Sequence, residues 1–290
     1  MKRYVLITPA HNEAALIEKT IASVTAQTVL PLKWVIVNDA STDDTRKVVE
    51  RHVKEHGFIQ LLNVERAAGR HFGNKVRAFN LGAAQVAGLQ FDFIGNLDAD
   101  ISFAPDYFEQ LLGRFDESSH LGIGGGMVHT LIDGNFVSQE VALDSVAGAV
   151  QLFRWKCYEQ VGGYRPLPEG GIDAAAEIAA RMHSWSTRTF PELRVNEHRL
   201  TGSATARPLA SRVKEGRRMH SLGYSPLFFL VRCLYRSLER PMVVGSIAAL
   251  YGYARASLKR NPTALPREMV RFLRSEQHNK LKRLLRLKTA

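Results

Sequence analysis

Short apolar runs alternate with longer stretches of helical periodicity along the first hundred residues. The runs are rich in β-branched and aromatic side chains and cover residues 4–8, 34–38, 58–63 and 91–96. Strands that alternate with helices predict βαβ units, and therefore a mostly parallel sheet flanked by helices. One helix is predicted over 42–56, with Ser41 as its cap.

Polar residues follow three of these four predicted strands. In an open α/β sheet, ligands bind outside the carboxyl ends of the strands, so these residues are candidates for a site. They are His11, Asn12 and Glu13 after the first strand, Asp39, Asp43 and Asp44 after the second, and Asp98 and Asp100 after the fourth. The structural alternative is that Asn12 and Asp39 serve turns and that Asp43 and Asp44 serve a helix N-terminus.

Asp98 and Asp100 stand two positions apart at the end of the fourth predicted strand. Residues i and i+2 of a strand share a face, so the two carboxylates would repel each other unless a cation lies between them. Mg²⁺ and Mn²⁺ prefer oxygen ligands of this kind. The pair therefore indicates a metal site, and an ordinary acidic turn is the alternative.

The order and spacing of four segments resemble family 2 glycosyltransferases, nucleotide-sugar-dependent enzymes with the GT-A fold. The segments are ITPAHNEAALIEKTIASVTAQT, WVIVNDASTDDT, GNKVRAFNLG and NLDADISFAPDYFEQ, and the resemblance covers roughly residues 3–200. The resemblance implies a GT-A-like domain and transfer of a sugar from a nucleotide-sugar donor.

The resemblance also implies roles for individual residues. Residues at the first two strand ends would hold the uracil and ribose of a UDP-sugar, Lys75 would lie near the nucleotide, and Asp98-Ala99-Asp100 would be the DxD motif that engages ribose and a divalent metal (Mn²⁺ or Mg²⁺). The residues assigned to the uracil and ribose are Pro9, His11, Glu13 and Asp39. His198 follows a later predicted strand and is a candidate metal or phosphate contact, with a structural role as the alternative.

An inverting transferase needs a base to take the proton of the acceptor hydroxyl. The family places an Asp at a helix N-terminus after a Gly-Gly-Tyr turn, and Asp173 matches it. Ile172 departs from the pattern, since an acidic residue is common there. Glu177, one turn later, is a possible substitute, and helix capping by Asp173 is the structural alternative.

Two segments between these motifs carry weaker signals. The glycines at 124–126 either leave room for a ligand or mark a bulge. Arg154 and Trp155 fall where the family shapes its acceptor pocket, and Trp155 either stacks on a sugar or belongs to the core.

Composition adds bounds on class and compartment. The 290 residues, 45% of them hydrophobic, fit one large α/β domain with an appendage. Cys157 and Cys233 form neither a disulfide framework nor a zinc motif, which favours a reducing compartment. The apolar run at the N-terminus is too short for a secretory signal and is typical of a first strand.

The positive charge is concentrated in the C-terminal part. Residues 207–290 hold 19 of the 39 lysines and arginines but only 4 of the 28 acidic residues. Apolar blocks separate the basic residues, and none reaches the ~18 residues of a spanning helix. This pattern is typical of helices that lie on an anionic membrane, with Arg267, Arg271 and Arg274 on one stripe. Nucleic-acid binding is the alternative, but no nucleic-acid motif accompanies the charges.

The sequence thus predicts a GT-A-like catalytic domain over 1–206 and a basic helical region over 207–290 that associates with the cytoplasmic face of a membrane. The predicted function is metal-dependent, inverting transfer from a nucleotide sugar, with a UDP-sugar as the expected donor, to a saccharide or lipid-linked acceptor, as in polysaccharide or cell-envelope glycan synthesis. The alternatives are a nucleotidyltransferase-like enzyme and a membrane-bound relative without catalysis. A nucleotidyltransferase would need a basic phosphate-binding loop near the first strand, which PAHNEA lacks.

Overall fold

A computed structural model describes residues 2–65, 73–138, 142–199, 208–238 and 242–287. The chain divides into two compact units. The sheet unit comprises Met1–Pro166 and Ile172–Leu200, and the helical unit comprises Leu167–Gly171 and Thr201–Ala290.

The sheet unit is built on a nine-stranded sheet in the order β3-β2-β1-β4-β8-β6-β9-β5, with β7 paired to β6. The strands are β1 Tyr4–Ala10, β2 Lys33–Asp39, β3 Ile59–Val64, β4 Phe93–Leu97, β5 Ile101–Phe103, β6 Leu121–Ile132, β7 Asn135–Ser138, β8 Val150–Arg154 and β9 Ser186–Glu197. The first four strands are parallel, as predicted. The remainder is mixed, because β8 runs antiparallel to both β4 and β6.

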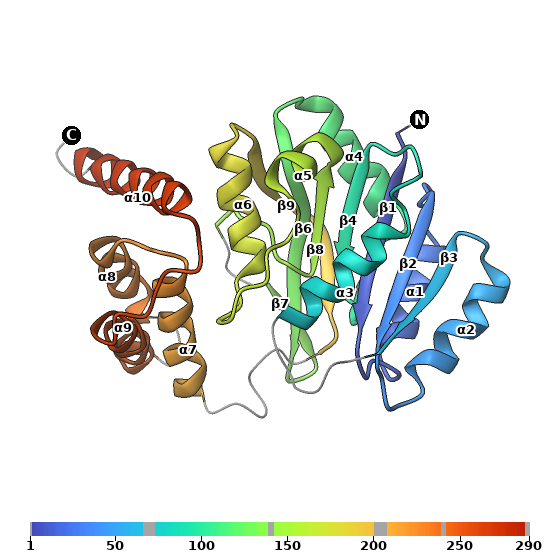
Figure 1. Ribbon diagram of the computed structural model, residues 1–290, viewed down its shortest axis with the longest axis horizontal. Helices are drawn as coiled ribbons and strands as arrows, with labels where there is room; N and C mark the ends of the chain where they lie inside the picture. Colours follow the sequence, from blue (N-terminus) through green and yellow to red (C-terminus); the bar gives the residue numbers. More distant parts are fainter. Residues whose placement is uncertain (1, 66–72, 139–141, 200–207, 239–241, 288–290) are drawn as a thin grey trace. The chain divides into compact units, whose positions relative to one another are not determined.

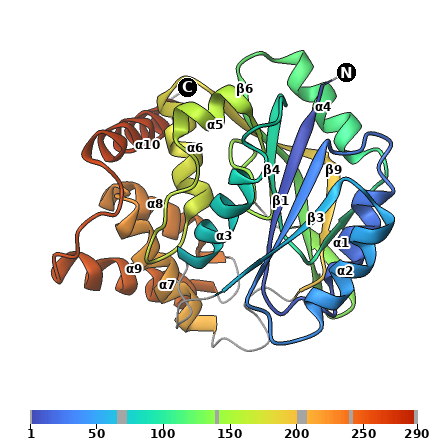
Figure 2. The ribbon, with the colours of Figure 1, turned by 45° about the vertical axis from the view of Figure 1, so that its right-hand side comes forward.

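Six helices cover the two faces of this sheet (Figures 1 and 2). They are α1 Ile17–Thr25, α2 Thr45–Glu55, α3 Gly73–Ala84, α4 Tyr107–Glu117, α5 Trp155–Val161 and α6 Ile172–Met182. Side chains alternate along a strand, so Leu6 of β1 belongs to the core cluster that includes buried residues of α1, α2 and α4, while Ile7 on the other face lies next to Gly82 of α3. The sheet is therefore buried on both sides, which explains why its strands read as nearly continuous apolar runs.

The helical unit contains α7 Pro208–Ser221, α8 Pro226–Tyr235, a 3₁₀ turn at Arg236–Leu238, α9 Met242–Leu258 and α10 Arg267–Leu287. Helices α7 and α9 approach closely at two glycines. A Cβ atom on Gly216 would collide with the carbonyl oxygen of Ala249, and one on Gly252 would collide with that of Val213. Within the described residues, no helix is both long and apolar enough to cross a membrane.

Candidate active site

Three strand ends meet at one edge of the sheet. Strands β1, β2 and β4 are parallel neighbours, so the chain leaves all of them on the same side. Asp39 ends β2 and is 8% exposed, and the ring of His11, just after β1, donates from Nδ1 to the carbonyl oxygen of Asp39 at 2.7 Å. Pro9 lies half-buried within β1 beside Val37 of β2. The structure therefore brings together the residues predicted to bind the nucleotide.

The loops after β1 and β2 are joined by hydrogen bonds. Asn12 has a φ of 58°, in the left-handed region that Asn tolerates, and its Oδ1 accepts from the backbone N–H of Thr42 at 2.8 Å. The backbone N–H of Glu13 donates to Oγ1 of Thr45 at 2.7 Å. These bonds fix the loop that carries His11 and Glu13.

The predicted start of the helix over 42–56 was wrong in detail. Helix α2 begins at Thr45 with Asp44 at the N-cap, and the side chain of Asp44 makes no capping hydrogen bond. Ser41 instead accepts a hydrogen bond from the backbone N–H of Asn12 at 3.0 Å, because the loop turns toward β1 before the helix begins. Asp43 accepts from the backbone N–H of Thr45, the first residue of α2, at 3.0 Å, which is the role at a helix N-terminus that was considered for it. Its other oxygen accepts from the backbone N–H of Ala14 at 3.0 Å.

Lys75 and Asp98 form a close ion pair. Lys75 lies in the first turn of α3, and its Nζ is 2.6 Å from Oδ1 of Asp98. Desolvation lowers the pKa of Lys75, but the charge and hydrogen bond of Asp98 outweigh it, and the pKa is raised overall. The ammonium therefore stays charged next to the first carboxylate of the DxD motif.

Arg199 bridges Glu13 and Asp100. Its Nη2 contacts Oε2 of Glu13, and its Nε lies 3.2 Å from Oδ2 of Asp100. Desolvation raises the pKa of Glu13 to about 7. Desolvation also raises the pKa of Asp100 to about 6, and the charges of Asp98 and Glu197 add to this effect. Arg199 therefore partly neutralises carboxylates that are held close together.

The balance of charge suits a divalent cation. The residues that contribute are five acids, Glu13, Asp98, Asp100, Asp173 and Glu197, and two bases, Lys75 and Arg199. When all are ionised, the acids exceed the bases by three charges. Carboxylate oxygens are the hard donors that Mg²⁺ and Mn²⁺ prefer, and a bound cation would relieve the repulsion between Asp98 and Asp100. The residues present therefore fit a divalent metal, with Asp98 and Asp100 as its candidate ligands.

Asp173 lies beside this cluster, in the first turn of α6. A Cβ atom on Gly148 would lie 3.0 Å from Oδ2 of Asp173, so the carboxylate contacts the loop before β8. The same loop borders the metal motif, since Asn96 donates to the carbonyl oxygen of Gly148 at 2.5 Å and the N–H of Asp98 donates to that of Ala149 at 2.9 Å. The structure thus places the predicted base close to the predicted metal site.

Glu177 occupies a different environment from Asp173. It is 4% exposed and accepts from the backbone N–H of Val146 at 2.5 Å and from Oγ of Ser145 at 3.0 Å. Desolvation raises the pKa of Glu177 to about 7. The proposed substitution of Glu177 for an acidic residue at 172 is therefore not supported, because its carboxylate holds the loop before β8 and is buried away from solvent.

His198 does not point to the metal motif. Its backbone N–H donates to the carbonyl oxygen of Asp100 at 2.8 Å, but its ring lies with Nε2 2.8 Å from Oγ of Ser102 and Nδ1 3.4 Å from Nζ of Lys19. The ring would have to turn before it could bind a metal held by Asp100. In this arrangement His198 is a structural residue, which was the alternative.

Two weaker expectations are corrected by the direction of β8. Because β8 is antiparallel to β4, Arg154 pairs with Phe93 at the start of β4, whereas Val150 pairs with Leu97 near Asp98. Arg154 donates to backbone carbonyl groups, including that of Phe115 at 2.8 Å. Arg154 and the adjacent Trp155 therefore lie at the opposite end of β4 from the candidate site and do not shape an acceptor pocket there.

The glycines at 124–126 serve packing within the sheet. A Cβ atom on Gly125 would collide with the carbonyl oxygen of Val150, and one on Gly126 with that of Leu193. The close approach of neighbouring backbone therefore explains glycine at these two positions, and room for a ligand is not needed to explain it.

Sequence reasoning did not identify Arg199 or Glu197 as part of the site. Both stand in the RVNEHRL segment, next to the histidine that was considered. Strand β9 pairs with β5, Glu197 opposite Ile101, and this pairing brings the end of β9 next to Asp100. The pairing joins segments almost a hundred residues apart, and the local pattern gives no signal for it.

The fold is of the GT-A type, and acidic residues gather at the edge of the sheet where β1, β2 and β4 end. The family model "Glycosyl transferase family 2" matches residues 5–166, which is more than half of the chain. The chain belongs to glycosyl transferase family 2.

Similarity to individual proteins covers smaller parts of their length. The chain is 29% identical to chondroitin synthase of Escherichia coli over 118 residues, 40% of this chain and 16% of that protein. It is 32% identical to an uncharacterized glycosyltransferase of Nostoc over 126 residues, 43% of this chain and 36% of that protein. The chain thus matches well under two thirds of the length of either relative.

Solved structures share the fold. The mannosyltransferase PcManGT of Pyrobaculum calidifontis, in complex with GDP-Man and Mn²⁺, aligns with a TM-score of 0.56 at 18% identity over 96% of this chain and 80% of its own. Residues 1–349 of TarS from S. aureus, in complex with UDP-GlcNAc, align with a TM-score of 0.56 at 16% identity over 89% and 73%. At these identities the similarity establishes the GT-A fold alone.

Proposed function

We propose that this protein transfers a sugar from a UDP-linked donor to a hydroxyl group of a saccharide or lipid-linked acceptor, with inversion at the sugar carbon. The observation that carries the proposal is the convergence of Glu13, Asp39, Asp98 and Asp100 at one sheet edge, with Lys75 and Asp173 beside them. Family membership supports glycosyl transfer over nucleotidyl transfer. Chondroitin synthase as a relative agrees with a role in polysaccharide or cell-envelope glycan synthesis.

The donor occupies the edge formed by β1, β2 and β4. Pro9, His11, Glu13 and Asp39 hold the base and ribose, and Lys75 supplies positive charge for the diphosphate. The complexes of TarS with UDP-GlcNAc and of PcManGT with GDP-Man and Mn²⁺ support a nucleotide-sugar donor and a divalent metal. Asp98 and Asp100 would hold the metal, which would offset the charge that develops on the leaving diphosphate.

Asp173 accepts the proton of the acceptor hydroxyl. A hydroxyl is a poor nucleophile at neutral pH, and a positioned carboxylate base contributes typically ~10²- to 10⁴-fold in rate. Glu177 keeps the neighbouring loop in place through Val146 and Ser145. The two carboxylates of α6 therefore have different roles: Asp173 takes part in the chemical step, and Glu177 stabilises the neighbouring loop.

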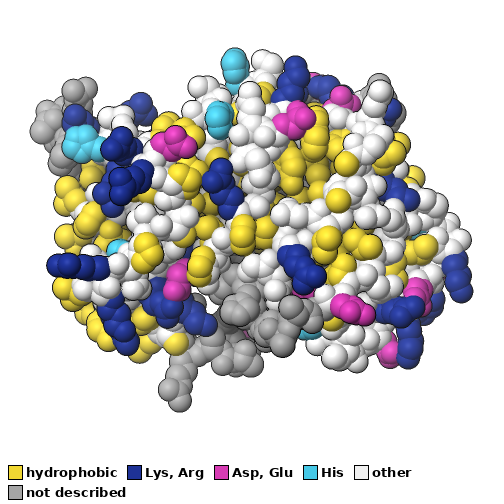
Figure 3. Space-filling view, in the orientation of Figure 1, with side chains coloured by type: hydrophobic (Ala, Val, Ile, Leu, Met, Phe, Trp, Pro, Cys, Tyr) yellow, Lys and Arg dark blue, Asp and Glu magenta, His cyan; other side chains and the backbone are white. Residues whose placement is uncertain are grey.

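The helical unit attaches the protein to an anionic membrane at its cytoplasmic face. Its surface carries large exposed apolar side chains in two stripes with helical spacing. These are Leu227, Leu230, Leu234 and Tyr235 on α8 and Val243, Val244, Ile247, Tyr251 and Leu258 on α9. Basic side chains accompany them, among them Arg255, Lys259 and Arg260, and Figure 3 shows hydrophobic and basic groups side by side on this unit.

The structure changes which helices would enter the lipid. On α10 the apolar residues Met269, Val270 and Leu273 are buried within the protein, and Leu284 is the one large apolar residue that is exposed among the α10 side chains that the structure describes. Helices α8 and α9 offer both kinds of group. Insertion of apolar side chains together with attraction of basic ones is how interfacial helices bind.

A donor panel tests the proposed activity. The full chain is incubated with Mn²⁺ and a set of UDP- and GDP-linked sugars, and release of the nucleoside diphosphate is measured with and without candidate saccharide acceptors. We expect Mn²⁺-dependent release from a UDP-sugar that an acceptor accelerates. Absence of binding and of release with every donor would contradict the proposal.

A further inference from the structure

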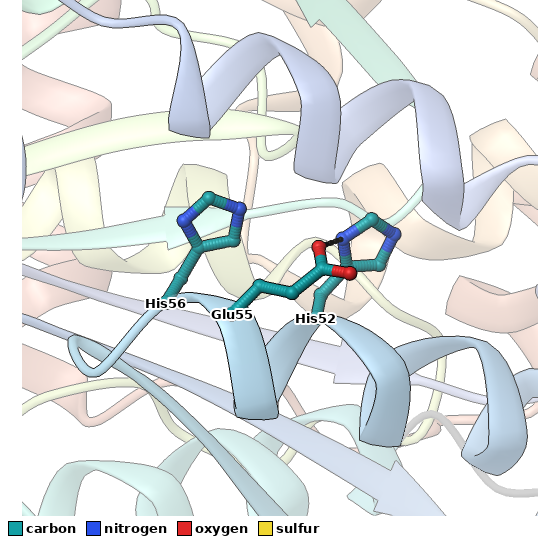
Figure 4. A group of neighbouring side chains, drawn as sticks. All are labelled: His52, Glu55 and His56. Atoms are coloured by element: carbon teal, nitrogen blue, oxygen red, sulfur yellow. Dashed lines mark ion pairs between the residues drawn. The ribbon is translucent and has the colours of Figure 1, made fainter.

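Three potential metal ligands cluster at the far end of α2 from the candidate active site. His52, Glu55 and His56 offer ligand atoms that all lie within 4.8 Å of one another. Figure 4 shows the three side chains on one side of the helix, with the Glu55 carboxylate turned toward His52. Helix α2 follows the carboxyl end of β2, so its last turn lies at the opposite edge of the sheet from Asp98 and Asp100. The cluster is therefore distinct from the nucleotide-binding edge.

His52 is the least satisfied of the three residues. Both of its ring nitrogens are buried, and neither makes a hydrogen bond. The nearest carboxylate oxygens lie on two sides of the ring: Oε2 of Glu55 is 3.6 Å from Nδ1, and Oε1 of Glu18 on α1 is 3.7 Å from Nε2. A buried polar nitrogen without a hydrogen-bond partner costs free energy, so a group that binds the ring nitrogens of His52 would stabilise the folded protein.

We propose that His52, Glu55 and His56 bind a late first-row divalent metal ion, Zn²⁺ in particular, which joins the end of α2 to α1. The spacing H-x-x-E-H places both imidazoles on one helical face and is one that zinc-binding helices use. The two rings are nearly parallel, with centroids 6.3 Å apart and planes 15° apart. The ligand atoms lie within 4.8 Å of one another, and the side chains would rotate to close around an ion that requires distances of ~2.0–2.2 Å.

Glu18 completes the site as the partner of a metal ligand. Metal-bound histidines nearly always donate their second ring N–H to a carboxylate, carbonyl or water. With His52 bound to the metal through Nδ1, its Nε2–H faces Oε1 of Glu18. The ion thereby satisfies both nitrogens of His52 and couples the two helices.

The position at the helix end also favours a cation. The backbone N–H of His56 donates to the carbonyl oxygen of His52 at 2.9 Å and closes the last turn of α2. The carbonyl end of a helix carries partial negative charge, which attracts positive ions. Imidazole ligands select Zn²⁺, Cu²⁺ or Ni²⁺ over Mg²⁺ and Mn²⁺, so this site and the carboxylate site prefer different ions.

Calorimetric titration of ZnCl₂ into the full chain at pH 7.5 tests the proposal, with His56→Gln as the main variant. His56 is half-buried at the helix end, so its replacement leaves the fold intact, which circular dichroism checks. His120→Gln, an exposed histidine elsewhere in the sheet unit, is the matched control. We expect Zn²⁺ to bind wild type and His120→Gln equally, and His56→Gln and Glu55→Gln at least ten-fold more weakly.

Two further readouts separate this site from the carboxylate cluster. Zn²⁺ should raise the melting temperature of wild type and His120→Gln but not of His56→Gln, and Cu²⁺ bound to wild type should show nitrogen hyperfine coupling in its electron paramagnetic resonance spectrum. Equal Zn²⁺ affinity in wild type and His56→Gln, or a Cu²⁺ spectrum with oxygen ligands alone, would overturn the proposal. Loss of glycosyl transfer is not expected in His56→Gln, so the two proposals fail independently.

Discussion

Asp173 and Glu177 are carboxylates one helical turn apart on α6, and their surroundings give them different roles. Asp173 reaches the loop that borders Asp98, whereas Glu177 is 4% exposed and bound by the backbone N–H of Val146. The sequence placed both on one helical face but gave no measure of their burial. Burial depends on the loop before β8, and that loop folds onto α6 only in the tertiary structure.

Replacing Asp173 should separate chemistry from binding. Asp173→Asn keeps the shape of the side chain but cannot accept a proton, so we expect turnover to fall by ~10²-fold or more while donor affinity stays unchanged. Turnover and calorimetric affinity are measured on the same preparation. Near-normal turnover in Asp173→Asn would remove it as the base.

Glu177 should make stability depend on pH. Desolvation raises its pKa to about 7 in the folded protein, above its value of 4.5 as a free group. A raised carboxyl pKa contributes stability that is fully present below pH 4.5 and is lost as the pH rises through 7. We therefore expect Glu177→Gln to flatten the fall in melting temperature between pH 5 and pH 8. The same slope in wild type and variant would contradict the assigned environment.

Among the elements, the four parallel strands were predicted from the sequence at nearly their observed positions, because β-branched runs separated by helical periodicity leave few alternatives. The strand-end rule then located Asp39, Asp98 and Asp100. The position of Arg154 was not predicted correctly, since an apolar run carries no information on strand direction and β8 runs antiparallel to β4. Arg199 was missed because the pairing of β9 with β5 is remote in sequence.

Because α7 packs closely against α9, we expect any side chain added at Gly252 to destabilise the helical unit. A Cβ atom there would collide with the carbonyl oxygen of Val213, so Gly252→Ala should destabilise the helical unit by ~1–3 kcal/mol. Gly113→Ala on α4 is the control, because nothing lies within 4 Å of its Cβ position. Replacing a helical glycine should stabilise α4 by ~0.5–1 kcal/mol. Thermal unfolding should move in opposite directions for the two variants, and equal shifts would contradict the packing.

For the molecule as a whole, the excess of basic residues and the exposed apolar stripes both lie in the helical unit. The sheet unit holds every residue assigned to the donor, and the helical unit holds the apolar stripes of α8 and α9. Composition predicted the basic character of the C-terminal part. It could not predict which helices leave their apolar residues exposed, because this depends on how the four helices pack.

Liposome sedimentation tests membrane binding through α9. We expect the full chain to pellet increasingly with anionic lipid content and to resist high salt only in part, because salt screens the basic groups but not the inserted apolar ones. Ile247→Ser with Tyr251→Ser should weaken pelleting, since these side chains are 59% and 55% exposed. Leu284→Ser on α10, also 55% exposed, is the matched control. Equal pelleting with neutral and anionic vesicles, or equal loss in both variants, would contradict the assignment.

The central claim is that Asp98 and Asp100 bind the nucleotide donor through a divalent metal. Calorimetry of UDP binding to wild type, Asp98→Asn and Asp100→Asn, each with and without Mn²⁺, tests this claim most directly. The account predicts that Mn²⁺ strengthens UDP binding in wild type, and that Asp100→Asn removes this gain while Asp98→Asn reduces it, because each loses an anionic ligand that offsets the charge of the metal. An affinity for UDP in Mn²⁺ that is unchanged in both variants would contradict it.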